Sequence, residues 1–215
     1  EVVTALHDDA DGFAVACLEE AAEVRALHAS ARILLLEGCF EASEYALAGQ
    51  LRLDLVIQGA EQGEAFLAAG LDIPLNVWLK LDSGMHRLGF DPAALRAWHA
   101  RLRNHPGVRE LNLISHFACA DERNHPLTEQ QLESFLGLLD LDFDQRSLAN
   151  SAAVLTIPAA HMDWLRPGIM LYGSTPLADL SAAELGLRPA MSLGAQLISL
   201  REVAVGESVG YGATW

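Results

Sequence analysis

The sequence predicts an α/β protein built as a (β/α)8 barrel of the TIM type, and three observations support this prediction. Short apolar runs alternate with helical patterns along most of the chain, which is typical of βα units with a parallel sheet. Seven such runs and six helical patterns fit a barrel better than an open sheet, with one strand lacking. Polar residues recur directly after the apolar runs, where a barrel carries its functional side chains. We expect the lacking first strand to precede Glu1, so that the chain is a fragment of a longer protein.

The expected elements alternate in chain order, and two helix starts carry their own signals. We expect strands at residues 12–17, 32–37, 53–58, 75–81, 110–116, 146–150 and 168–172, and helices at residues 18–28, 41–51, 62–69, 92–104, 128–139 and 151–157. Asp91 and Pro92 supply an N-cap and a proline at the first helical position. Thr128 with Gln131 has the form of a capping box.

The hydrophobic pattern changes after Arg188 and indicates a second domain. Residues 191–203 alternate between apolar and polar types without an intervening helix, and Gly206 and Gly210 interrupt the residues after them. We therefore assign residues 1–174 to the barrel and residues 175–190 to a linker. Residues 191–215 are the expected beginning of a C-terminal β domain.

The composition excludes several classes of protein. A formal net charge of −15 argues against a protein that binds the phosphate backbone of nucleic acids. No apolar run approaches the length of a membrane-spanning helix, so we expect no membrane association. The 3 cysteines form no CxxC pair and the 8 histidines show no HExxH or HxH spacing. We therefore expect a cytoplasmic protein with reduced thiols and no metal site.

Charged side chains gather after the apolar run at residues 73–79. Lys80, Asp82 and Arg87 follow within eight residues, and desolvating three charges at a strand end costs several kcal/mol unless they pair or meet a charged ligand. The alternative is a solvated turn, for which Asp82, Ser83 and Gly84 would suffice.

Further candidates come after the later apolar runs. His116 ends one run, and Ser151 starts a helix, where a hydroxyl and free backbone N–H groups suit an anion. Arg166 remains a cation at any working pH. Each has an ordinary structural alternative: an N-cap for Ser151, a hydrogen-bonded barrel histidine for His116, and a surface arginine for Arg166.

Taken together, these stretches resemble the alanine racemase family, whose members are pyridoxal-phosphate enzymes with a barrel followed by a β domain. The matching stretches are residues 10–16, 80–89, 115–122, 150–151, 165–169 with 172–173, and 209–214. The specific elements are Lys-x-Asp-[Ser/Thr]-Gly-Met-x-Arg-x-Gly at residues 80–89 and Arg-Pro-Gly-Ile at residues 166–169. The similarity covers nearly the whole chain in order.

The resemblance implies roles for the residues around the pyridoxal 5'-phosphate cofactor. Arg166 would donate to the pyridine nitrogen, keep it unprotonated and restrain the ring as an electron sink. His116 would link Arg166 to the catalytic tyrosine by hydrogen bonds. Ser151 and the backbone of Gly168 and Ile169 would hold the phosphate.

Three further residues acquire roles from the same resemblance. Arg87 would contact the phenolic oxygen of the cofactor and the substrate. Lys80 matches a lysine that is often carbamylated in this family, and the resulting anion would hold Arg87. Tyr211 would be one of two acid–base groups and would reach into the barrel of the partner subunit in a homodimer. A phenol with a pKa near 10 needs cationic neighbours to act as a base near neutral pH.

The resemblance implies racemisation of alanine by two-base proton transfer, which would supply D-alanine for the cell wall or serve alanine catabolism. The Schiff-base lysine and a second tyrosine of the family have no match within these residues, so we expect the fragment itself to be inactive. The alternatives are a broad-specificity amino-acid racemase or a related barrel-type pyridoxal-phosphate enzyme such as a decarboxylase, a non-catalytic pyridoxal-phosphate carrier, and an inactive remnant. The Gly-Tyr-Gly-Ala setting of Tyr211 favours a racemase, and the expected β domain argues against a carrier.

Overall fold

The computed structural model describes residues 1–214 and contains one parallel sheet of seven strands in chain order. The strands are β1 (Gly12–Val15), β2 (Arg32–Leu35), β3 (Asp54–Ile57), β4 (Leu75–Lys80), β5 (Val108–Ile114), β6 (Arg146–Asn150) and β7 (Trp164–Arg166). Each strand pairs in parallel with the next one, and β1 and β7 are the two edges of the sheet among the described residues. The predicted α/β barrel is therefore confirmed as a parallel, seven-stranded part of a barrel.

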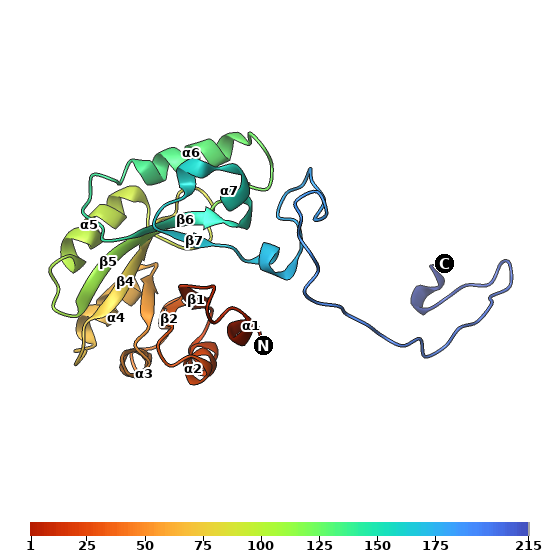
Figure 1. The fold of residues 1–215 in the computed structure, drawn as a ribbon, viewed down its shortest axis with the longest axis horizontal. Coiled ribbons are helices and arrows are strands. Elements are labelled where there is room, and N and C mark those ends of the chain that lie inside the picture. The colour runs from red at the N-terminus through yellow and green to blue at the C-terminus, as the bar shows by residue number, and fades with distance from the viewer. Residues whose placement is uncertain (215) are drawn as a thin grey trace.

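The helices lie along the outer face of the curved sheet (Figure 1). They are α1 (Val2–Ala5), α2 (Leu18–Leu27), α3 (Glu44–Gln50), α4 (Ala60–Ala68), α5 (Pro92–Leu102), α6 (Pro126–Leu136) and α7 (Ser151–Thr156). The later part of the chain also contains the 3-10 turns η1 (Pro158–Ala160), η2 (Ile169–Tyr172) and η3 (Tyr211–Ala213). Asp91 caps α5 as predicted, because its side chain accepts the Ala94 N–H at 2.8 Å and Pro92 occupies the first turn.

The central strands β3 and β4 and the second half of β5 are buried on both faces, which explains why they appear in the sequence as nearly continuous apolar runs. The edge strands β1 and β7 are only partly buried. In β4, Val77 and Leu79 join the large core between the sheet and the helices, whereas Trp78 faces the barrel interior. Trp78 forms a small second cluster there with Val56 and Ile114. The polar residues of the inner face therefore lie on the two sides of a thin apolar layer, toward the amino ends and toward the carboxyl ends of the strands.

The last predicted strand, at residues 168–172, is wrong. The structure has its seventh strand earlier, at β7, and residues 169–172 form the 3-10 turn η2 instead. Pro167 has no N–H for a strand ladder, and Gly168 adopts φ −115° and ψ −87°, which turns the chain away from the sheet. Arg166 is thereby the last residue of its strand.

The predicted capping box at Thr128 and Gln131 is also wrong. The helix α6 begins at Pro126, two residues earlier, and its N-cap is His125, whose ring nitrogen accepts the Leu127 N–H at 3.2 Å. The Thr128 hydroxyl donates to the Cys119 carbonyl at 3.1 Å instead. The Gln131 side chain is completely buried and turns toward the strand ends.

The segment after η2 divides into a packed part and an exposed part. Leu177 is only 5% exposed and belongs to the core, and the Ala178 N–H donates to the Asp121 carbonyl at 3.1 Å. Residues 188–214 are exposed throughout and contain no strand, because an extended segment needs a neighbour to pair with. The division into barrel, linker and β domain remains a prediction.

Candidate functional site

Four of the residues predicted for the site stand at the carboxyl ends of the strands. Lys80 ends β4, His116 follows β5 by two residues, Ser151 begins α7 directly after β6, and Arg166 ends β7. Nη2 of Arg166 lies 3.4 Å from Nδ1 of His116. Parallel strands place these ends on one side of the sheet, which is where a barrel carries its active site.

The guanidinium of Arg166 is held by neutral acceptors. It donates to the Ser147 hydroxyl and, at 2.6 Å, to the Ser115 carbonyl. Within residues 1–214 no carboxylate forms a salt bridge with Arg166, and burial lowers its pKa to about 10. Arg166 is half-buried, and a cation that is partly desolvated without an anionic partner has a strong affinity for an anion or a good hydrogen-bond acceptor.

The neighbours of Arg166 carry less positive charge than their residue types suggest. Burial lowers the pKa of His116 to about 4, and the positive charges of Arg166, Lys80 and Arg87 contribute to this shift. His116 is therefore neutral at neutral pH. Burial, with the same arginines, also lowers the pKa of Lys80 to about 8. Lys80 is the only lysine among the 215 residues.

The loop that follows β4 is folded by Asp82. Its Oδ1 accepts the N–H groups of Gly84 and His86 at 3.0 Å each, and its Oδ2 lies 3.1 Å from Nδ1 of His86. Gly89 has φ +122°, and a Cβ there would lie 2.7 Å from the Asp82 nitrogen, so only glycine fits. Asp82 thus shapes the turn, as the alternative interpretation held. Arg87 is exposed on this loop and influences the site through its charge.

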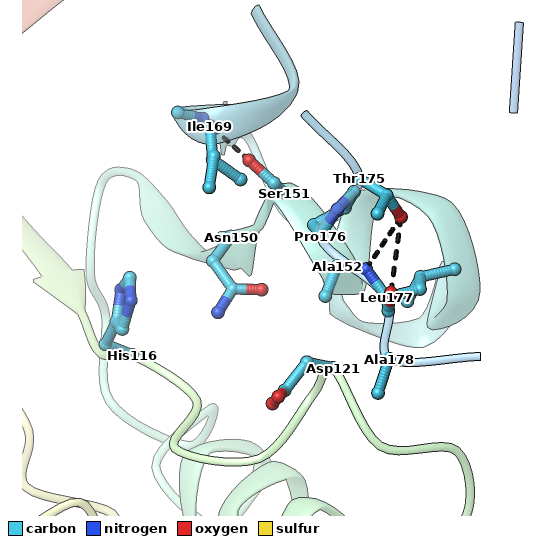
Figure 2. A pocket seen from close by; sticks show the side chains of 11 residues that line it. His116, Asp121, Asn150, Ser151, Ala152, Ile169, Thr175, Pro176, Leu177 and Ala178 are labelled. Carbon is cyan, nitrogen blue, oxygen red and sulfur yellow. Dashed lines mark hydrogen bonds between the residues drawn. The ribbon is translucent and has the colours of Figure 1, made fainter. Parts of the chain in front are cut away.

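A cavity of about 470 Å³ opens beside His116 and Ser151 (Figure 2). The residues that line it are His116, Asp121, Asn150, Ser151, Ala152, Gly168, Ile169, Thr175, Pro176, Leu177 and Ala178. The N-cap of α7 is Asn150, whose Oδ1 accepts the Ala153 N–H at 3.1 Å. The Ser151 hydroxyl is therefore not used for capping. It accepts the Gly168 N–H at 2.8 Å and is 5% exposed.

Comparison with known proteins gives the family. The family model described as "Alanine racemase, N-terminal domain" matches residues 1–176. The chain belongs to this family. It is 99% identical over 215 residues to the biosynthetic alanine racemase of Pseudomonas aeruginosa, covering 100% of this chain and 60% of the relative. The catabolic alanine racemase of the same organism is 48% identical over 211 residues, with 98% and 59% covered.

A solved structure supports the same assignment. The crystal structure of the biosynthetic alanine racemase from Pseudomonas aeruginosa superposes with a TM-score of 0.95 at 99% identity, covering 100% of this chain and 60% of that one. The chain thus spans 60% of the length of this relative and of this solved chain.

Tyr211 is not brought to the site of its own barrel. It is fully exposed in the tail that runs away from the sheet (Figure 1). Other residues of this alanine racemase domain shape the site although no role was predicted for them: Ser115 and Asn150, which lie in the matching stretches, and Ser147 and the stretch 175–178. A polar residue within an apolar strand, as at Ser147, is the signal that could have found one of them. The stretch 175–178 carries no such signal.

The described residues contain neither a candidate metal site nor a candidate membrane-spanning helix. Among residues 1–214, no three histidine, cysteine, aspartate or glutamate side chains form a group that could hold a metal ion. In the same part of the chain, no helix combines the length and apolarity needed to cross a bilayer.

Proposed function

We propose that the protein to which this chain belongs converts L-alanine to D-alanine and back with pyridoxal phosphate as cofactor. The observation that carries this proposal is Arg166, half-buried without a carboxylate partner among the described residues and next to a neutral His116. Identity of 99% with a biosynthetic racemase against 48% with a catabolic one supports a role in supplying D-alanine.

The residues present fit the proposed cofactor. The Ser151 hydroxyl and the Gly168 N–H face each other in the cavity, and both are groups that bind phosphate oxygens. No atom outside its chain neighbours lies within 4 Å of a Cβ built at Gly168, so space is open at this position. When bound, pyridoxal phosphate withdraws electrons from the Cα of an amino acid and acidifies its proton.

Arg166 and His116 would set the electronic properties of the site. A guanidinium cannot give up its proton to a pyridine nitrogen, so Arg166 would donate a hydrogen bond and keep that nitrogen unprotonated. A neutral His116 can accept from Arg166 at Nδ1 while its Nε2–H orients a tyrosine hydroxyl. Arg87, on the exposed loop, would hold the carboxylate of the substrate.

Lys80 is proposed to carry a carbamate. A lysine with a pKa of about 8 has a sizeable neutral fraction at physiological pH, and its amine can add to carbon dioxide with loss of a proton. The product is an anion that would attract Arg87. The neighbouring Asp82 is engaged by the backbone of its own loop and does not take this position.

The function is tested with the protein at its natural full length. L-Alanine is incubated with the enzyme and pyridoxal phosphate, and D-alanine is measured by chiral chromatography, with L-serine offered in parallel to test a broader specificity. We expect D-alanine to form faster than D-serine. A folded, cofactor-loaded protein that produces no D-alanine would refute the proposal.

The proposed role of Tyr211 as a base at the partner's site is tested by complementation. A Tyr211→Phe subunit and a subunit that lacks the cofactor-binding lysine should each be inactive as homodimers. In a heterodimer both lesions fall in one site if Tyr211 acts across a two-fold interface, so the other site is intact and activity recovers toward half. If Tyr211 serves its own barrel, each site keeps one lesion and the mixture stays inactive.

A further inference from the structure

The completely buried side chain of Gln131 joins α6 to two of the loops that carry the site. Its Oε1 accepts the Ala118 N–H at 2.9 Å. Its Nε2 donates to the His116 carbonyl at 3.0 Å and to the Ser83 hydroxyl at 3.2 Å. Both amide protons and the amide oxygen are therefore used, and the partners fix which end of the amide is which.

The hydrogen bonds continue from Gln131 in one direction. The Ser115 hydroxyl donates to the Leu81 carbonyl at 2.8 Å, so the Ser83 hydroxyl must donate to Ser115, over 2.9 Å. The Ser83 hydroxyl in turn accepts a hydrogen bond from Nε2 of Gln131. The chain of donors thus runs from Gln131 through Ser83 and Ser115 to Leu81, and it ties the loop after β4 to the end of β5.

The two serines in the middle of this chain lead to the residues of the site. The carbonyl of Ser115 accepts from Arg166 at 2.6 Å, and the next residue, His116, lies 3.4 Å from the same guanidinium. On the other side, Ser83 belongs to the loop that carries Arg87. That loop also touches α6 directly, since a Cβ at Gly84 would lie 3.4 Å from the Cγ of Gln131.

We propose that Gln131 is a positioning residue that fixes His116 relative to Arg166 and to the loop of Arg87. An apolar residue of similar size would fill the same buried volume, but it could neither hold the Ala118 N–H nor orient the His116 carbonyl. A polar side chain buried here therefore serves geometry rather than packing. The catalytic consequence rests on the proposed function, whereas the positioning itself does not.

The test compares Gln131→Met with the matched control Gln130→Met, in which the same change is made at an exposed residue of the same helix. The measurement is the pKa of His116 by NMR titration of the imidazole in the full-length protein. The charges around His116 are those of Arg166, Lys80 and Arg87, and Asp121 lines the same cavity. Loosening the His116 backbone admits water and moves the ring from these cations. We expect the pKa to rise from about 4 by about one or more in Gln131→Met and to stay in place in Gln130→Met.

A second variant separates the two arms of the network and serves if Gln131→Met does not fold. Ser83→Ala removes the link to the loop after β4 but keeps the bond from Gln131 to His116. We expect about tenfold faster hydrogen exchange at the amides of Gly84 and His86, with the pKa of His116 unchanged.

The outcomes are distinguishable from a merely structural role and from failure of the proposed function. A lower melting temperature with the pKa of His116 unchanged in a folded Gln131→Met would overturn the proposal. Unchanged exchange in Ser83→Ala would overturn it as well. If the protein is a racemase, Gln131→Met should also lower kcat about tenfold with a smaller change in KM. The pKa and exchange measurements need no racemase activity.

Discussion

The inner face of the barrel holds one arginine at the amino ends of the strands and another at their carboxyl ends, and the two arginines have opposite kinds of partner. At the amino end, Arg32 donates from Nε to Asp54 and from Nη2 to Glu110, both at 2.7 Å, and from Nη1 to Gln145 at 3.0 Å. Its guanidinium lies 5.0 Å from the centre of the Trp164 ring. At the carboxyl end, Arg166 has only neutral acceptors among the described residues.

The contrast shows which end is complete without a ligand. The guanidinium at the amino end is paired with two carboxylates of the same chain, and Asp54 receives two more hydrogen bonds, from Asn76 and Trp78 at 2.9 Å each. The carboxyl end leaves positive charge uncompensated, which favours an anionic ligand there. The amino end therefore stabilises the fold, and the carboxyl end is organised for binding at the expense of stability.

Removal of Arg32 should have the largest effect on stability. Arg32→Met leaves Asp54 and Glu110 without a cation, and breaking such a partly buried pair costs about 3–5 kcal/mol of unfolding free energy. Chemical denaturation measures the change. The control is Arg123→Met, which removes an exposed pair with Asp179 and should cost about 0–1 kcal/mol. Equal losses in the two variants would contradict the role assigned to the amino end.

The matching change at the other end should affect activity instead. Arg166→Met removes a half-buried cation without an anionic partner, so the unfolding free energy should stay level or rise. Racemase kcat in the full-length enzyme should fall about 10²–10³-fold, because a donor to the reacting system is lost. Steady-state kinetics and denaturation of the same variant measure both effects. A loss of stability as large as that of Arg32→Met would remove the distinction between the ends.

The pH dependence of stability should report the cationic end. The pKa of His116 is lowered from 6.5 to about 4, so the unfolded chain takes up this proton at a higher pH than the folded chain. Stability should therefore fall as the pH drops from about 6.5 toward 4, by roughly 2 kcal/mol at pH 5. In His116→Asn this part of the acid destabilisation should vanish. An unchanged difference between pH 7 and pH 5 in that variant would show that burial and the neighbouring cations do not lower the pKa of His116 in the folded chain.

The smallest effect concerns the modification of Lys80. With a pKa of about 8, about a tenth of the amine is neutral at pH 7, and this fraction rises as the pH rises through 8. Incubation with ¹³C-bicarbonate should give one carbamate resonance that is absent from Lys80→Arg. The same spectrum for both proteins would show that Lys80 carries no carbamate.

The sequence predicted the sheet well because local patterns determine its strands. The strand at β4 was expected at residues 75–81 and is found at Leu75–Lys80, since a run of buried residues ending in a charge marks its own boundary. The strand expected at residues 168–172 failed because Pro167 and Gly168 redirect the chain. The proposed capping role of Gln131 failed because its partners include Ser83, 48 residues away in the sequence. A contact between residues so far apart in the sequence leaves no pattern in the local sequence.

The roles of the site residues could be predicted only in part. Lys80, His116, Ser151 and Arg166 follow strands, so parallel topology alone brings them to one end of the sheet. Their hydrogen-bond partners could not be predicted, since Ser147 and the Ser115 carbonyl are chosen by the register of neighbouring strands. The position of Tyr211 relative to a catalytic site depends on contacts outside the barrel and stays a prediction.

The single lysine also gives the chain a natural reporter of unfolding. A lysine-specific protease has one bond to cut within these residues, between Lys80 and Leu81. Leu81 is 1% exposed and its N–H donates to the Ile114 carbonyl at 2.8 Å, so the folded chain cannot enter a protease cleft at this point. Cleavage there requires the middle of the sheet to open, and its rate under native conditions follows the population of globally opened molecules.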